Sequence, residues 1–272
     1  VLRVPTQLMA GARRSAREPG KSDPIDAMSV ARAALREPGL PHARLDGRER
    51  HLKLLVDHRE DLVGERTRIQ SRLRWHLHEL MPEHLVPLRT LHRFHVLEDL
   101  RTRLDALDGP VAAIARELVE RTRELTVRIN ELTREITALV SELAPTLLGL
   151  QGCGPLSAAK LVAETAGIDR FRSRSAFARW NGTAPIPVWT GNVKFRLSRG
   201  GNRQANAAIH RIAISQWRDH GLGHDYVARR IAGGDPKRSA IRALKRRLSD
   251  EIFRRLHEDL DRRQPPENTL AA

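Results

Sequence analysis

Apolar residues recur at seven-residue intervals along two long, charged stretches of the chain, 46–80 and 110–143. Two interleaved series run through the second stretch: Leu118, Leu125, Leu132 and Leu139, with Ala115, Thr122, Ile129, Ile136 and Leu143. The first stretch has a weaker repeat with arginines in the middle of one series: Leu55, Leu62, Ile69 and His76, with Leu52, Arg59, Arg66, Leu73 and Leu80. Such repeats are typical of helices in coiled coils. Two long helices are predicted, joined by a weaker helix over 88–107. They either fold back as an antiparallel arm or pair with a second chain, and the pattern favours neither.

After Pro145 the repeat gives way to short elements. Gly152 and Gly154 precede Pro155 in a turn that resembles a helix-hairpin-helix turn, whose backbone amides would face a DNA phosphate. An ordinary turn between helices is the alternative. Further helices are expected over 156–165, 204–217, 226–232 and 237–256, and a turn signal at 190–192 indicates a short β-hairpin. The predicted fold is therefore mainly α, with a long coiled-coil arm followed by a helical C-terminal domain.

The charge of the chain indicates a polyanionic partner. Lys and Arg total 48 against 33 Asp and Glu, which gives a net charge of +15. Aromatic residues make up only 4% of the chain, so phosphates rather than stacked bases would provide most of the contact. The single cysteine, Cys153, excludes an intrachain disulfide and suits a reducing cytoplasm. No stretch is long and apolar enough to span a bilayer, so no membrane partner is expected.

Basic residues concentrate at a glycine-rich turn before the helix predicted over 204–217. The nucleic-acid-binding residues expected there are Lys194, Arg196, Arg199, Gly200, Gly201, Asn202 and Arg203. A glycine turn and the free amides at a helix start suit a phosphate, although a basic surface loop before a buried helix also explains them. The polar face of the last helix adds Arg242, Lys245 and Arg246. This face carries enough positive charge to follow a phosphate backbone.

Two carboxylates lie close together near the start of the chain, at Asp23 and Asp26. Pro24 fits the beginning of a helix, so Asp23 is expected to be its N-cap and Asp26 to favour its positive end. The alternative is catalytic, because two carboxylates about one helical turn apart can both reach one divalent metal.

Several motifs together resemble the DEDD-type insertion-sequence transposases (the IS-one-ten family, guided by a bridge RNA). They are Lys21-Ser-Asp-Pro-Ile-Asp-Ala, Leu148 to Pro155, Asn181-Gly-Thr-Ala-Pro-Ile-Pro and Arg196-Leu-Ser-Arg-Gly-Gly-Asn-Arg-Gln, in the family's order. The resemblance implies a RuvC-like nuclease domain, a coiled-coil arm and a C-terminal transposase domain that contributes a hydroxyl nucleophile. It also implies DNA and a guide RNA as partners, a homo-oligomer formed through the coiled coil, and a bacterial, nucleoid-associated location in the cytoplasm.

The resemblance also assigns catalytic roles. Asp23 and Asp26 match the last two carboxylates of the family's Asp-Glu-Asp-Asp tetrad, which would bind Mg²⁺ and stabilise the charge on the phosphate. The nucleophile of the family sits in a serine-glycine element before the arginine-rich turn. This chain has Thr190-Gly191 there, so Thr190 is the expected nucleophile and Ser198 a poorer one.

The expected organisation is a remnant of the RuvC-like domain over 1–40, the arm over 46–143, the transposase domain over 145–260 and a disordered tail over 261–272. The first two carboxylates of the tetrad would precede Val1, so we expect a truncated transposase with weak strand transfer or none. The alternative is a non-catalytic coiled-coil protein that binds nucleic acid without Mg²⁺. Its binding would survive Asp23→Ala and Asp26→Ala.

Overall fold

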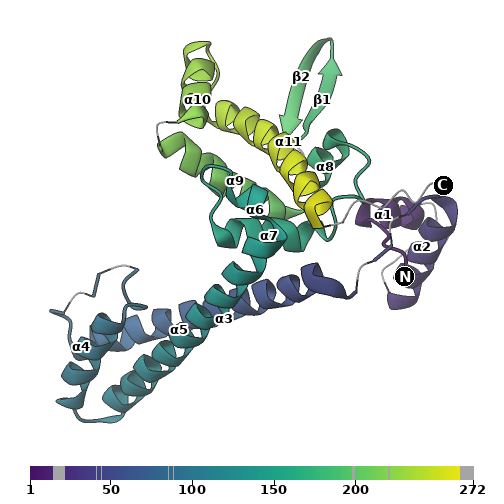
Figure 1. Ribbon diagram of the computed structural model, residues 1–272. Helices are drawn as coiled ribbons and strands as arrows, with labels where there is room; N and C mark the ends of the chain where they lie inside the picture. Colours follow the sequence, from purple (N-terminus) through teal and green to yellow (C-terminus); the bar gives the residue numbers. More distant parts are fainter. Residues whose placement is uncertain are drawn as a thin grey trace, which may run out of the picture. The chain divides into compact units, whose positions relative to one another are not determined.

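The computed structural model describes residues 1–14, 22–40, 42, 43, 45–84, 86, 87, 89–197, 200–219 and 221–263, and these are mainly α-helical (Figure 1). The chain divides into two compact units, residues 1–47 and residues 48–272. The assignment of the four expected domains stays a prediction. None of the helices in the described ranges is both long and apolar enough to cross a membrane.

The first unit consists of two helices that pack on each other, α1 (Thr6–Arg14) and α2 (Asp23–Arg36). The side chain of Ser22 accepts a hydrogen bond from the backbone N–H of Ile25, at 3.4 Å, so Ser22 is the N-cap of α2. The prediction of Asp23 as N-cap was therefore wrong by one residue. Asp23 and Asp26 lie in the first turn, where their charge favours the positive end of the helix.

The arm is formed by α3 (Gly47–Leu80) and α5 (Pro110–Leu143), which lie side by side and extend away from the C-terminal helices of the second unit (Figure 1). Arg59 Nε donates to Thr133 Oγ1 at 2.7 Å, and Arg66 donates to Thr126 Oγ1 at 3.1 Å. The partner numbers fall as the α3 numbers rise, so the helices run antiparallel within one chain. Both predicted helices are confirmed, and the structure supplies the direction that the sequence left open.

The buried face of α3 differs from the predicted heptad. Its buried residues are Leu52, Val56, Ile69, Leu73 and Leu77. Leu52, Ile69 and Leu73 belong to the two predicted series. The predicted positions Leu55, Leu62 and His76 are only half-buried, and the buried Val56 and Leu77 lie outside both series. The reason is that α3 joins two different cores. Its beginning packs with the C-terminal helices, whereas its end packs in a second cluster that includes α4 (Phe94–Asp105), a helix shorter than predicted.

The C-terminal helices are short and share one core. They are α6 (Pro145–Leu148), α7 (Pro155–Thr165), α8 (Arg174–Trp180), α9 (Arg203–Arg218), α10 (Leu222–Ala232) and α11 (Lys237–Arg263). The first turn of α10 and the last turns of α11 were missed by the periodicity. The apolar stripe of α11 packs against α6, α8, α9 and α10, and its members Leu244, Leu248, Ile252 and Leu256 are buried.

The predicted hairpin is present as β1 (Pro185–Thr190) and β2 (Asn192–Leu197), two antiparallel strands. Trp189 pairs with Val193, and Gly191 adopts a positive φ of 95° between the strands. The tail expected over 261–272 is replaced over 261–263 by the end of α11. Its residues 264–272 lie outside the described residues.

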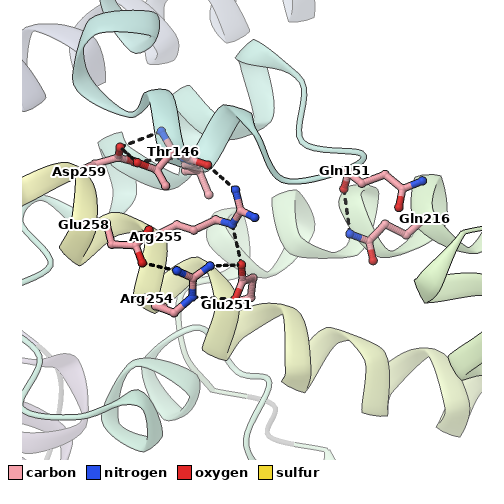
Figure 2. Close-up of polar contacts among 9 residues, drawn as sticks. Thr146, Gln151, Gln216, Glu251, Arg254, Arg255, Glu258 and Asp259 are labelled. Carbon is pink, nitrogen blue, oxygen red and sulfur yellow. Dashed lines mark hydrogen bonds and ion pairs between the residues drawn. The ribbon is translucent and has the colours of Figure 1, made fainter.

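Figure 2 shows how the turn after the arm is fixed to α11 and α9. The buried carboxylate of Asp259 accepts hydrogen bonds from the backbone N–H groups of Thr146 and Leu147, at 2.8 and 3.1 Å. Arg255 donates to the carbonyl oxygen of Thr146 at 2.5 Å, and Gln216 donates to that of Gln151 at 2.8 Å. The bonds to Asp259 satisfy backbone amides at the start of α6, and the other two fix carbonyl oxygens in α6 and in the turn after it.

Two substitutions on α3 test the placement of the buried face. Leu73→Ala removes a fully buried side chain and should lower the free energy of unfolding by about 2–5 kcal/mol. Leu54→Ala is the matched control, because Leu54 is about half exposed, and it should cost less than about 0.5 kcal/mol. Urea unfolding followed by circular dichroism measures both. Equal losses would contradict the assignment.

Candidate nucleic-acid interface

A cavity of about 430 Å³ lies between α9 and α11. The first turns of α9 contribute Arg203, Asn206, Ala207 and His210 to its wall. The beginning of α11 contributes Arg238, Ile241, Arg242 and Lys245, and three loop residues complete it: Gly182, Gly200 and Asn202. On each helix the lining residues are spaced i, i+3, i+4 and i+7, so each helix presents one face to the cavity.

The cavity is strongly cationic. Among the described residues that line it, four are Arg or Lys and none is Asp or Glu. Arg203, Arg238 and Arg242 are exposed, and the structure gives them no ion pair with any described carboxylate. We call these three arginines and Lys245 the cation cluster. Because like charges repel, a cluster without carboxylates favours an anionic ligand.

Lys245 is the most enclosed member of the cation cluster. Burial, and after it the charge of Arg242, lowers the pKa of Lys245 to about 8. Its ammonium donates to Asn206 Oδ1 at 2.6 Å. Burial and then the neighbouring Lys245 also lower the pKa of His210. The second cause in each case is a neighbouring cation, and the positive charge of these neighbours favours an anionic ligand.

Asn206 connects the cation cluster to the segment before the hairpin. Its Nδ2 donates to the carbonyl oxygen of Asn181 at 2.7 Å while its Oδ1 accepts from Lys245. Asn181 is completely buried, and its own Nδ2 donates to Ser249 Oγ of α11 at 2.8 Å. The segment that leads into β1 is therefore tied to both walls of the cavity.

The glycine turn before α9 needs Gly201 for packing. Gly201 has a φ of 97°, and a Cβ there would lie 2.5 Å from the carbonyl oxygen of Trp180. A larger residue would have to displace backbone, so the position requires glycine. Asn202 is the N-cap of α9, with its Oδ1 accepting from the N–H of Ala205 at 2.8 Å. Gly200, Asn202 and Arg203 line the cavity as well, and their contact with nucleic acid stays a prediction.

The other predicted contacts are distributed differently. Lys194 and Arg196 belong to β2 by their backbone, but their side chains lie outside the described part of the chain, as do the side chain of Thr190 and residues Ser198 and Arg199. Arg246 forms an ion pair with Asp250 and does not line the cavity.

The predicted turn at Gly152 and Gly154 has the expected bend, because Gly152 has a φ of 78°. However, a Cβ on Gly152 would lie 3.0 Å from Ser215 Cβ, so this glycine packs closely against α9. Gly154 precedes α7 and is exposed. A phosphate contact at this turn stays a prediction.

Within the described residues, Asp23 and Asp26 alone do not form a complete binding site for a divalent metal. Asp26 forms an ion pair with Arg13, which competes with a metal for its oxygens. No group of three or more His, Cys, Asp or Glu side chains that could hold a metal occurs in the ranges that the structure describes. The cysteine is equally unsuited to chemistry, because burial raises the pKa of Cys153 to about 12.

His210 and Asn206 line the cavity but were not among the residues predicted from the sequence. The signal was available, because Arg203, Asn206 and His210 lie on one helical face directly after the glycine turn. This spacing alone does not indicate a binding site, since the exposed face of any amphipathic helix is expected to be polar.

Two family models match the sequence. The model described as the transposase IS116/IS110/IS902 family matches residues 144–228, and the DEDD transposase model of IS110 elements matches residues 1–82. The matches cover the motifs at 21–27, 148–155, 181–187 and 196–204, in the expected order. The chain belongs to the IS110 family of transposases. The resemblance in the sequence is therefore confirmed, and no curated protein matches the chain.

Family membership makes the protein a DNA transposase, with DNA as its substrate. DEDD transposases in general depend on divalent metals. The α9 wall of the cavity lies inside the matched residues 144–228, whereas Arg238, Arg242 and Lys245 of α11 follow them. The two walls of the cavity therefore meet only in the tertiary structure of the transposase.

The lowered pKa of Lys245 predicts how stability changes with pH. The unfolded chain keeps the ordinary, higher lysine pKa, so between about pH 8 and that value it binds more protons than the folded transposase. Stability contributed through Lys245 therefore rises with pH in this window. Relative to Lys245→Met, the wild type should gain unfolding free energy between neutral pH and pH values well above 8. Parallel pH profiles in thermal or urea unfolding would contradict the shift.

Proposed function

We propose that the transposase holds the DNA backbone in the cavity between α9 and α11, with phosphates bound by Arg203, Arg238, Arg242 and Lys245. The observation that supports this is the cation cluster itself, which no described carboxylate in the cavity wall neutralises. Arginine and lysine contacts to phosphate release condensed counterions, which supplies most of the affinity of a sequence-independent grip. Such contacts position a duplex and leave the choice of sequence to other interactions.

We further propose that Thr190 is the nucleophile that the family resemblance implies. Thr190 is the last residue of β1, and this strand follows the segment that Asn181 and Asn206 tie to the cavity. In the reaction, Thr190 Oγ1 forms a bond to a DNA phosphorus while the bond from phosphorus to the deoxyribose oxygen breaks. The departing oxygen keeps the electron pair and receives the proton that the hydroxyl loses, so the exchange is a balanced transesterification.

Asp23 and Asp26 are the proposed metal ligands, with Mg²⁺ as the metal. They would need further ligands beyond the described side chains, and the ion pair of Arg13 with Asp26 would have to open. No step of the reaction is therefore assigned to the metal.

We also propose a guide RNA and a second copy of the chain as partners, at the bacterial chromosome in the cytoplasm. The arm supports the second copy, because several large apolar side chains are exposed on it: Leu54, Trp75, Ile114 and Val127. Sedimentation velocity tests this partner, and a monomer at micromolar concentration would argue against it.

Arg242→Ala tests the grip on the backbone. It should weaken binding of a labelled duplex of random sequence several-fold and reduce the slope of log affinity against log salt by about one, as expected for one lost phosphate contact. Arg254→Ala is the matched control on the same helix, since Arg254 is occupied by Glu251 and Glu258. Fluorescence anisotropy at several salt concentrations measures the slope. An unchanged slope in Arg242→Ala would show that the cavity does not bind DNA phosphates.

Thr190→Ala tests the nucleophile. With labelled DNA carrying the sequence that adjoins the gene in its own genome, Thr190→Ala should abolish the protein–DNA adduct that resists denaturation, because no hydroxyl remains to attack. Thr190→Ser should form more adduct than the wild type, since it lacks the β-methyl group that crowds the oxygen. Ser198→Ala is the control and should retain the adduct. Adduct formation that survives Thr190→Ala, or that is lost in Ser198→Ala, would overturn the assignment.

A further inference from the structure

A buried lysine connects the arm to the C-terminal helices. Lys160 of α7 is only 2% exposed, although lysine is rarely buried without a partner. Its ammonium lies 2.7 Å from Glu60 Oε2 and 3.7 Å from Asp57 Oδ1, both on the arm helix α3. Glu164, one turn further along α7, lies 3.9 Å away. Two helices of the second unit that are distant in sequence are thus joined by charge.

Glu164 has a separate partner for each of its oxygens. Oε1 faces the lysines and lies 3.1 Å from Lys53 of the arm. Oε2 accepts a hydrogen bond from Asn202 Nδ2 at 2.6 Å. Burial opposes the charge of Lys53, but its hydrogen bonds to Asp57 and Glu164 outweigh this and raise the pKa of Lys53. One carboxylate thus contacts the arm on one side and the start of α9 on the other.

Asn202 connects Glu164 to the α9 wall of the cavity. With Nδ2 directed to Glu164, its Oδ1 is directed to the N–H of Ala205, which it caps at 2.8 Å. Its own N–H donates to the carbonyl oxygen of Trp180 at 2.6 Å. Asn202 also lines the cavity beside Arg203. The hydrogen bond that Asn202 donates to Glu164 therefore fixes which end of the amide faces the helix, and with it the start of the α9 wall.

A purely structural role explains this arrangement poorly. Replacing a buried ion pair by apolar side chains of similar volume is often neutral or stabilising, so stability alone does not require charges here. A polar network instead enforces one arrangement of its members.

We propose that Lys160 and Glu164 are positioning residues that couple the docking of the arm helix α3 to the shape of the cation cavity. This inference rests on the proposed function of the cavity. Coupling between two sites is reciprocal, so arm docking would tighten DNA binding and DNA would tighten arm docking by the same factor. An event on the arm, such as the arrival of a second copy, would then change how firmly DNA is held.

The first test is Glu164→Gln with Ala205 as a reporter. The variant keeps an oxygen for Asn202 but loses its attraction to Lys53 and Lys160. Hydrogen exchange of the Ala205 amide, followed by NMR without DNA, should become roughly fivefold faster because the cap loosens. The Ala176 amide, held by the Ser173 cap of α8 at 3.2 Å, is the internal control and should not change. Unchanged exchange at Ala205, or an equal rise at both amides, would overturn the coupling.

Lys53→Met provides a second variant that disturbs the core less, since Lys53 is about a quarter exposed and lies on the arm. Faster exchange at Ala205 in this variant supports transmission from the arm. Its absence, with the fold intact, would overturn that part of the proposal.

The affinity for a random-sequence duplex distinguishes positioning from simple electrostatics, because the two predict changes in opposite directions. Removing a negative charge should strengthen DNA binding if electrostatics alone acts, whereas loss of positioning should weaken it, by roughly threefold to tenfold. The salt slope should stay unchanged, because Glu164 touches no phosphate. Glu258→Gln removes the same charge from α11 and is the matched control. If Glu164→Gln binds the duplex as tightly as this control, or more tightly, the inference is overturned.

The two proposals fail in different ways. If Arg242→Ala leaves the affinity and the salt slope unchanged, the cavity is not the DNA site, whatever the exchange rates show. The exchange experiment needs no DNA, so it decides separately whether the arm and the α9 cap are coupled.

Discussion

The apolar stripe of α11 is the constraint on which the C-terminal part of the transposase depends. Leu244, Leu248 and Ile252 bury one face of this helix against α6, α8, α9 and α10, so the position of each of these elements is set by the same stripe. Asp259 and Arg255 extend the contact to the turn after the arm (Figure 2). Because the stripe faces the core, the neighbouring arginines must face outward, and beside α9 they form one wall of the cavity.

The cavity shows a conflict between stability and function. Four cations share it, no Asp or Glu is among the described residues that line it, and the lowered pKa of Lys245 reflects the burial and repulsion that the folded chain tolerates. Other arginines of α11 form ion pairs, as Arg254 does with Glu251 and Glu258. A group of cations with no carboxylate among the described residues around it is characteristic of a site that receives its counter-charge from a ligand.

The arm is an intrachain antiparallel hairpin that joins two cores. Its far end packs with α4, whereas its near end meets α7 through Lys160 and the carboxylates of α3. A rigid element fixed at one end by charges can report on events at its other end. The arm is therefore more than a spacer if the network through Glu164 acts as proposed.

The sequence by itself determined the elements that local periodicity encodes. The ends of α5 followed from Pro110 and an almost unbroken heptad, and the hairpin followed from the turn at Gly191. The family followed from the order of short motifs. The N-cap of α2 and the buried face of α3 were wrong in detail, because a cap depends on local backbone angles and a buried face depends on what packs against it.

Only the tertiary structure decided which residues meet. The cationic faces of α9 and α11 are separated in the sequence by α10, and each face alone resembles an ordinary solvated helix face. Lys160 likewise looks like a surface lysine in a short helix until α3 covers it. Periodicity reports which side of a helix is apolar, but the choice of neighbour depends on long-range packing of the whole core, which no local pattern contains.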